Sequence, residues 1–220
     1  MRALACLVMT TGLLALGAPV QAQSLSARAG TTGLGAEVGV GFGSTFGLRA
    51  QLATGSYARD EVQSNISYEG KLKLSNGALL LDLHPFAGSF RLSAGAVYNN
   101  NQLEATGQGQ SGTIEINGIS YPAAAVGSLN AAVHWDKASP YVGLGWGSQP
   151  SGGGLFFSAD VGAFYQKPTA SLTGTCSPLV PPLACNQLQS DIRAEEAQFQ
   201  IEVNKYKLYP VLTLGVGYRF

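Results

Sequence analysis

The chain has 220 residues, of which 29 are glycine and only 12% are charged, and its formal net charge is zero. Soluble domains average about 25% charged residues, so this composition is unusual for a soluble domain. The absence of a basic patch or a run of like charge argues against nucleic acid as a partner. Beyond the N-terminal segment no apolar stretch reaches the length of a spanning helix, which excludes a helical inner-membrane protein.

Residues 1–22 have the features of a secretory signal peptide. A single arginine follows the initiator methionine, the next residues are mostly apolar or small, and Val20-Gln21-Ala22 offers a cleavage site before Gln23. A membrane anchor is the alternative, but glycines and a proline interrupt the apolar run, whereas a spanning helix needs about 20 apolar residues. We expect removal of residues 1–22 and one mature domain over residues 23–220.

Apolar side chains then alternate with small or charged ones in segment after segment. The segments with this pattern are 34–42, 46–52, 90–98, 157–165 and 206–220. In a strand successive side chains point to opposite faces, so each segment has one apolar and one small or polar face. Segments of about ten residues with this period are typical of a transmembrane barrel. A soluble β-sandwich or lipocalin-like carrier is the alternative, with its apolar set turned inward.

Two longer segments, 66–84 and 129–147, change the parity of their apolar residues partway. In the first segment the change falls at Ser75-Asn76-Gly77. Asn-Gly favours a hairpin turn, but the strand after it would be short, so we expect a β-bulge that absorbs one residue. The second change falls near residues 136–140, where a bulge and a true turn both remain open.

The number of strands must be even in a bacterial single-chain barrel, and the pattern gives seven long segments. The eighth strand is either residues 24–30 or the product of a turn at 136–140. With either solution the sequence predicts an all-β fold, an eight-stranded antiparallel up-and-down transmembrane β-barrel.

Short turns are expected at residues 43–45, 84–89 and 148–154, and aromatic residues crowd around them. These residues are Phe42, Phe46, Phe86, Phe90, Trp146 and Phe157, while Tyr98 and Tyr165 lie further along their strands. The spacing indicates two interfacial girdles. We place the short turns at the periplasmic rim and the connections 59–65, 107–127 and 173–205 outside. Segment 186–205 fits either a strand or a short amphipathic helix in a loop, and we expect the helix.

Two cysteines remain after the signal segment, Cys176 and Cys185. Because an exported chain passes through an oxidising compartment, we expect these cysteines to form a disulfide that closes a short loop. Neither histidine of the chain lies near them in the sequence, so we expect no metal site there.

The export signal, the alternating segments, the girdles and the ending Gly215-Val216-Gly217-Tyr218-Arg219-Phe220 together resemble the small outer-membrane barrels of the OmpA/OmpX type. The resemblance covers almost all of residues 23–220. It implies a place in the bacterial outer membrane, contact with outer-membrane lipid, and recognition by the barrel assembly machinery. In that comparison Tyr218 and Phe220 occupy the positions of the assembly signal.

An eight-stranded barrel has an interior just wide enough to be filled by side chains. The parity that faces inward carries Glu37, Arg49, Glu69, Lys71, Lys73, Asp82, Arg91, Asp160 and Arg219. Buried charges are costly unless they are paired, so we expect a network of ion pairs in the lumen. The alternative is a narrow polar channel for small solutes.

These observations favour a structural or surface-interaction role without a cofactor. A lipid-modifying enzyme is a third hypothesis, for which His134 with Asp136 and Ser139 is the best-placed set, since His84 falls at a periplasmic turn. A nucleophile and its base must lie within hydrogen-bonding distance, and sequence spacing does not show that. We expect that the protein is not an enzyme.

Overall fold

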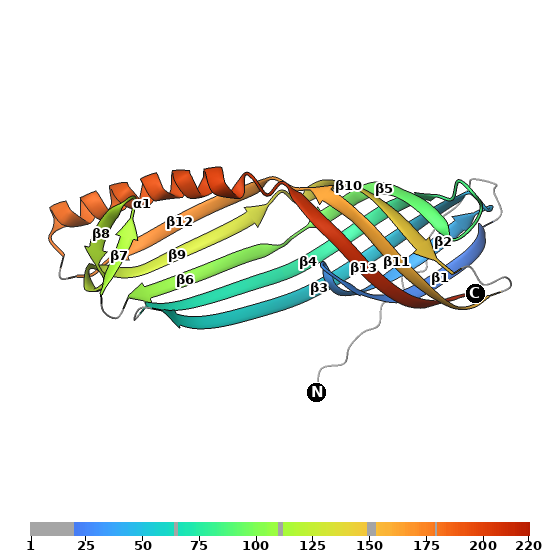
Figure 1. The fold of residues 1–220 in the computed structure, drawn as a ribbon, viewed down its shortest axis with the longest axis horizontal. Helices are drawn as coiled ribbons and strands as arrows, with labels where there is room; N and C mark the ends of the chain where they lie inside the picture. Colours follow the sequence, from blue (N-terminus) through green and yellow to red (C-terminus); the bar gives the residue numbers. More distant parts are fainter. Residues whose placement is uncertain (1–19, 64–65, 110–111, 149–152, 179) are drawn as a thin grey trace, which may run out of the picture.

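The computed structural model describes residues 20–63, 66–109, 112–148, 153–178 and 180–220. Eight antiparallel strands close into a barrel, each strand next to its successor around the ring, with β4–β5 and β1–β13 among the pairings that complete it (Figure 1). In ring order the strands are β1 (Val20–Gly30), β2 (Gly33–Phe42), β3 (Phe46–Gln63), β4 (Ile66–Leu83), β5 (Phe90–Asn99), β10 (Ala138–Gly147), β11 (Gly154–Tyr165) and β13 (Leu208–Arg219). The predicted eight-stranded up-and-down barrel is confirmed.

Strand β1 answers the open question of the eighth strand. It pairs with β2 on one side and with β13 on the other, so residues 24–30 form part of the barrel wall. Every pair between β1 and β13 involves Ser24 or a later residue of β1. Cleavage after Ala22 would therefore leave this seam intact. Residues 1–19 lie outside the described part, so the signal peptide stays a prediction.

Beyond the barrel, three strands continue the wall as an open sheet. β6 (Gln102–Gly109), β9 (Val126–Trp135) and β12 (Pro168–Cys176) follow or precede the barrel strands β5, β10 and β11 in the chain. β6 pairs with the outer half of β4, β9 pairs with β6, and β12 pairs with β9. Together with the outer halves of β3 and β4 they form the extension sheet, which Figure 1 shows projecting from one end of the barrel.

Short breaks at residues 100–101, 136–137 and 166–167 separate the barrel strands from the extension strands. Buried amide side chains bond the backbone and one another there. The Asn99 side chain donates to Gln166 Oε1 at 2.8 Å, and Asn101 Oδ1 accepts hydrogen bonds from the Ser75 N–H and from Asn76 Nδ2, each at 3.0 Å. A polar layer therefore lies where the barrel meets the extension.

The bulge predicted at Ser75-Asn76-Gly77 is absent. β3 and β4 pair without a register shift over residues 46–63 and 66–83. Even-numbered residues of β4 face inward along the described part of the strand: Leu72 and Leu74 in its outer half, Asn76 and Asp82 in the barrel. The side-chain chemistry changes instead, because the outward face is apolar around the barrel and polar in the extension.

The same explanation replaces both interpretations of segment 129–147. The chain neither bulges within one strand nor reverses at residues 136–140, but passes from β9 into β10 in one direction. Odd-numbered residues face inward in both strands, where Val133 and Tyr141 are buried. The apolar set moves from the inner to the outer face at the break. This inversion marks the outer limit of the apolar surface of the barrel.

Around the barrel the outward side chains form an apolar belt. Its exposed members include Leu25, Leu34, Val38, Leu52, Leu79, Leu81, Leu92, Val142, Leu144, Phe157, Val161, Leu212, Leu214 and Val216. At the end that carries the short turns, Phe90 contacts Trp146 with ring centroids 5.4 Å apart, and Tyr218 contacts Phe220 at 5.1 Å. An outward face of this kind is typical of a transmembrane barrel. In the described residues no helix has the length and apolarity that crossing a membrane requires.

Helix α1 (Pro182–Val203) is longer than the short helix predicted, and it covers the free edge of the extension sheet (Figure 1). The Gln200 side chain accepts a hydrogen bond from the Ala170 N–H at 2.8 Å and donates one to the Pro168 carbonyl at 3.1 Å. Gln189 donates to the Gly174 carbonyl at 2.8 Å. Unpaired strand edges invite association with other chains, and these side chains occupy part of the edge of β12.

A hairpin of β7 (Thr113–Ile116) and β8 (Ile119–Pro122) closes the outer end of the extension and is followed by a 3₁₀ turn, Ala123–Ala125. Its turn residue Asn117 donates from its backbone N–H to Glu195 of α1 at 2.9 Å, and Tyr121 donates to Asp191. The Tyr121 hydrogen bond holds the pKa of Asp191 below its usual value. The hairpin is therefore fixed to α1 by polar contacts.

Candidate functional site

Six charged side chains from six strands meet in the barrel lumen, and we call them the charge ring. They are Arg28 of β1, Glu37 of β2, Arg49 of β3, Asp82 of β4, Arg91 of β5 and Asp160 of β11, and all six are at least 92% buried. Three arginines balance three carboxylates, so the ring is formally neutral. Basic and acidic residues alternate from β1 to β5.

Each charge of the ring has an opposite partner. Arg49 lies at the centre: it pairs with Asp82, reaches Glu37 at 2.9 Å and lies 3.4 Å from Asp160. Arg28 pairs with both Glu37 and Asp160, and Arg91 pairs with Asp160 at 2.7 Å. Neutral groups add to the network, because Ser93 donates to Asp82 at 2.6 Å and Gln51 donates to Glu37 at 2.6 Å. Such pairing offsets the cost of burying six charges.

Two glycines make room for the ring on the strands that carry no charge in it. A Cβ atom at Gly145 of β10 would lie 2.5 Å from both Arg91 Nε and Asp160 Oδ1. A Cβ atom at Gly215 of β13 would lie 3.5 Å from Arg28 Cγ and 2.7 Å from Ser158 Oγ. The absent side chains let Arg91 and Arg28 cross these strands and reach Asp160.

An apolar layer lies on the extension side of the charge ring. Leu80, Val97, Tyr141, Phe164 and Val211 form a buried cluster, and Phe164 stacks on Tyr209 with ring centroids 4.8 Å apart. A cavity of only about 30 Å³ is bounded by Arg28 and Asp160 on one side and by Leu80 and Phe164 on the other. The lumen is therefore filled by two successive layers, one ionic and one apolar.

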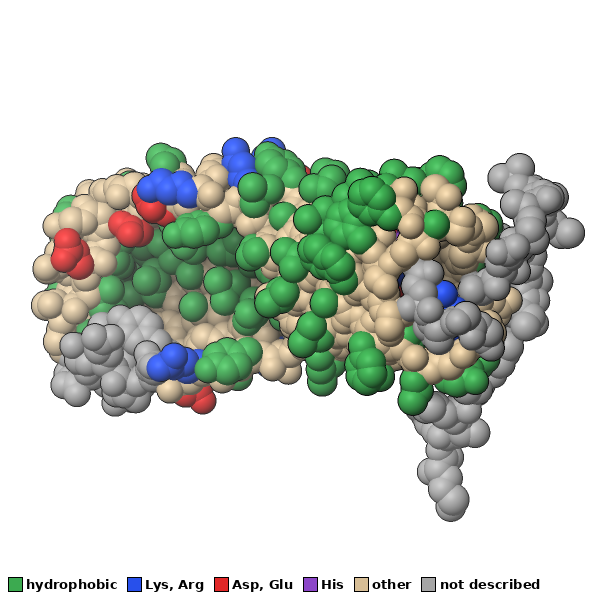
Figure 2. All heavy atoms as spheres, turned by 45° about the vertical axis from the view of Figure 1, so that its right-hand side comes forward, with side chains coloured by type: hydrophobic (Ala, Val, Ile, Leu, Met, Phe, Trp, Pro, Cys, Tyr) green, Lys and Arg blue, Asp and Glu red, His purple; other side chains and the backbone are tan. Residues whose placement is uncertain are grey.

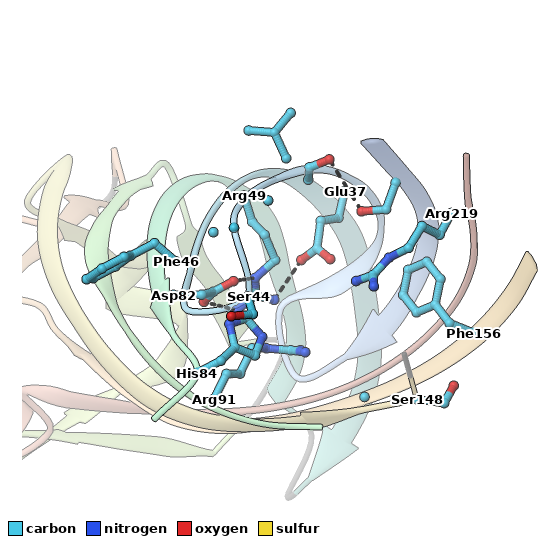
Figure 3. Close-up of a pocket in the computed structure, with 17 residues that line it drawn as sticks. Glu37, Ser44, Phe46, Arg49, Asp82, His84, Arg91, Ser148, Phe156 and Arg219 are labelled. Atoms are coloured by element: carbon cyan, nitrogen blue, oxygen red, sulfur yellow. Dashed lines mark hydrogen bonds and ion pairs between the residues drawn. The ribbon is translucent and has the colours of Figure 1, made fainter. Parts of the chain in front are cut away.

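On the other side of the ring a cavity of about 110 Å³ lies at the end with the short turns (Figure 3). Arg49, Asp82, His84 and Arg219 line it, and burial lowers the pKa of His84. Figure 3 shows Arg219 pointing toward the cavity beside Phe156. Its Nε atom is buried without a hydrogen-bond partner within the described residues. Arg219 therefore lines this cavity and does not join the charge ring.

The structure brings together five of the nine charges assigned to the lumen and places three others elsewhere. Glu69, Lys71 and Lys73 are wrong as lumen residues, since they lie exposed on the outer face of the extension sheet, where Lys73 lies 3.8 Å from Glu104. The predicted bulge would have turned these three side chains inward. Because β4 pairs with β3 without a register shift, they face outward instead.

Sequence reasoning missed Arg28 because residues 24–30 were only one option for the eighth strand. The alternation of Ser24, Ser26 and Arg28 with Leu25, Ala27 and Ala29 contains the signal that would have found it.

The other sequence-based candidates lie apart from the lumen layers or on opposite faces. His134 is exposed on the outer face of β9, whereas Ser139 is buried in the lumen with 1% exposure. Cys176 and Cys185 form a disulfide with a Cα–Cα distance of 5.8 Å, which joins the end of β12 to the first turn of α1. In the described part of the chain no cluster of three or more His, Cys, Asp or Glu residues could hold a metal ion.

No protein-family model matches the sequence, and no curated protein matches it either. Two of the solved structures that share the fold come from Acinetobacter baumannii. CarO of Acinetobacter baumannii is 23% identical with a TM-score of 0.60, and the match covers 90% of this chain and 97% of that one. CarO2 of the same organism is 22% identical with a TM-score of 0.60, covering 90% and 98%. At this identity the likeness shows a shared fold.

Proposed function

We propose that this protein is an integral outer-membrane barrel that does not conduct solutes and that supports a sheet at the cell surface. The observation that carries the proposal is the filled lumen, in which the charge ring and the apolar layer follow one another. Mutually paired charges offer no free sites to a passing ion, and the apolar cluster excludes water. A structural or surface-interaction role is what this arrangement supports best.

The outer-membrane location has two supports besides the architecture shared with CarO. The apolar belt encircles the barrel and is lost where the extension begins. The resemblance to barrels of the OmpA/OmpX type adds the terminal aromatics, since Tyr218 and Phe220 occupy the positions that the assembly machinery would recognise. Outer-membrane lipid and that machinery are thus the proposed partners, together with a surface partner bound by the extension.

Labelling of intact cells tests the location and its sidedness. Thr169 lies on the outer face of β12, and Ser89 lies in a short turn at the opposite end. Each is replaced with cysteine in a separate variant. In a Gram-negative host a membrane-impermeant maleimide should label the Thr169→Cys variant and leave Ser89→Cys unlabelled until the cells are opened. Labelling of Ser89→Cys alone would show the opposite orientation. Recovery of both variants in the soluble fraction would disprove the membrane location.

Conductance in planar bilayers tests the closed lumen. We expect the wild-type protein to give no steady current at either polarity. A narrow channel for small solutes is the second candidate, which the 110 Å³ cavity at one mouth favours. Reproducible single-channel steps from the purified protein would establish the channel and overturn a sealed barrel.

We propose no catalytic role. His134 and Ser139, the best pair that the sequence offered, lie on opposite faces of the wall and cannot exchange a proton directly. An altered lipid profile on deletion of the gene, restored by the wild type and not by His134→Ala, would reverse this proposal.

A further inference from the structure

The extension sheet has the inverse polarity of the barrel. On its inner face Tyr57 pairs with Leu72, Leu72 with Leu103, and Leu103 with Val133 across successive strands. On its outer face lie Lys71, Lys73 and Glu104. An apolar face normally requires a covering layer, and an exposed one marks a binding surface.

In the described structure the part of this inner face on β9 and β12 is covered, since Val133 is 3% and Ala170 is 7% exposed. There Leu188 and Ile192 of α1 and Ile116 of the hairpin pack over Leu172 and form a buried cluster. On β3 and β6 the apolar side chains of the same row stay accessible: Tyr57 is 63% and Leu103 is 39% exposed. Figure 2 shows a hollow lined by hydrophobic side chains in this half of the molecule. We call the accessible inner face of β3, β4 and β6 the trough. The strand register assigns to it Tyr57, Leu72, Leu74, Leu103 and Ala105.

The trough is continuous with the apolar belt. Gly33, at the end of the turn between β1 and β2, lies next to the trough residue Leu74. A Cβ atom at Gly55 would lie 3.5 Å from both Gly33 Cα and Leu74 Cδ1. Directly beneath, Leu34 and Leu52 project from the belt with 69% and 73% exposure. The barrel strands β1, β2 and β13 have no extension of their own, so one side of the trough stays open above the belt. The lipid around the belt is therefore the nearest apolar material.

The charges beside the trough bear on which lipid headgroup could lie at its edge. Helix α1 carries one basic residue, Arg193, against four acidic ones, Asp191, Glu195, Glu196 and Glu202. Arg59 has the inward parity of Tyr57 on β3, and Lys205 and Lys207 follow the helix in the chain. Charges of both signs therefore border the trough, and its apolar contacts select the ligand.

We propose that the trough binds an acyl chain of a lipid from the leaflet that surrounds the belt. The chain lies against Tyr57, Leu72 and Leu103, and the headgroup remains at the open side. This inference rests on the proposed membrane location and extends it to a specific lipid contact outside the belt.

The chain contains only two tryptophans, which makes the proposal testable by fluorescence. Trp135, at the barrel end of β9, has the inward parity of Val133 and is half-buried, while Trp146 is 48% exposed on the belt near the short turns. Trp146→Phe and Trp135→Phe each leave a single reporter. The proteins are placed in phosphatidylcholine vesicles whose acyl chains carry bromine, which quenches tryptophan on contact. We expect loss of emission from both reporters and protection of Trp135 from acrylamide in water.

Variants on the two faces of the same strands provide the matched comparison. Leu72→Gln with Leu103→Gln should reduce quenching of Trp135 by bromine and admit acrylamide. Lys73→Gln with Glu104→Gln, on the outer face, should leave both readings unchanged. Heat-modifiable gel mobility reports folding, and Tyr57→Ser is the substitute if the double leucine variant fails to fold.

The outcomes separate this inference from the proposed location. If brominated chains quench Trp146 while acrylamide alone reaches Trp135, the trough is water-filled and the inference is wrong, although the membrane location stands. If neither quencher reaches Trp135, protein covers the trough and the inference is again wrong. If brominated chains quench neither tryptophan, the barrel is not in the bilayer and both proposals fail.

Discussion

Arg49 is the residue on which the charge ring depends most, because it contacts all three carboxylates. Truncating one member of a buried ion-pair network leaves its partners charged and desolvated. The barrel wall itself has no such dependence, since its strands are held by backbone hydrogen bonds.

We therefore expect Arg49→Met to lower the free energy of unfolding by about 3–5 kcal/mol, the usual cost of breaking a buried pair. Lys73→Met is the control, since its pair with Glu104 is about half exposed and should contribute about 0–1 kcal/mol. Urea unfolding in detergent or lipid vesicles, followed by tryptophan emission, measures both. Equal effects of the two substitutions would contradict a dominant role for the ring.

Asp191 should make the attachment of the hairpin sensitive to acid. Because its pKa is lowered in the folded protein, chiefly by the Tyr121 hydrogen bond, its contribution is fully present above the unfolded pKa of about 3.9. The contribution is lost as the pH falls through the folded pKa. The protection factors of the amides paired between β7 and β8 should fall below about pH 4 in the wild type. This fall should shrink in Asp191→Asn, and a fall of the same size in that variant would rule out this carboxylate.

At the scale of the element, β12 pairs with a strand on one side only, and helix α1 covers its other edge. Its glutamine and glutamate side chains reach backbone groups of the strand, and the disulfide ties its first turn to the strand's end. A helix held by side chains in this way protects an edge without continuing the sheet.

Replacing Gln200 and Glu196 with alanine should expose the N–H groups of Ala170 and Leu172 to solvent. We expect hydrogen exchange at these two amides to become faster while exchange in the barrel strands stays the same. Arg193→Ala, exposed on the same helix, is the control. Unchanged protection at Ala170 would show that the edge is held by something other than these side chains.

The element scale also shows where sequence reasoning succeeded and where it failed. Alternation in segments such as 34–42 and 206–220 predicted barrel strands because one environment acts along the whole segment. In β4 and β9 a single strand passes through two environments, so the apolar set changes face while the backbone stays regular. A pattern of polarity alone cannot distinguish that change from a bulge. The misplacement of Glu69, Lys71 and Lys73 follows from this ambiguity.

The contacts of the charge ring were beyond the sequence for a different reason. Parity identifies a side chain as inward, but the height at which it meets its partners depends on register and strand tilt. Glu37, Arg49 and Asp160 could thus be assigned to the lumen, while the central place of Arg49 and the crossing over Gly145 and Gly215 could not.

At the scale of the whole molecule, two layers close the lumen, and removing one should not open it. Phe164→Ala with Tyr141→Ala removes much of the apolar layer and leaves the charge ring. We expect this variant to remain silent in planar bilayers, and to conduct only when Arg91→Ala also opens the ring. Current through the apolar-layer variant alone would show that the ring passes ions, and silence of the triple variant would point to further obstruction.

The order of charges around the wall has a consequence for how the barrel reaches its final form. Each of the first five strands offers its neighbours a charge of opposite sign, and Asp160 accepts arginines from across the two strands that carry glycine. A chain that skipped or exchanged a strand would set like charges side by side in a dry interior, where repulsion is strong. Arg28 of β1 reaches Asp160 of β11 across β13, so this ion pair at the closing seam forms only when every strand is in place. Closure with all eight strands is thereby favoured over closure with a strand missing, because only the native strand order pairs every charge in the lumen.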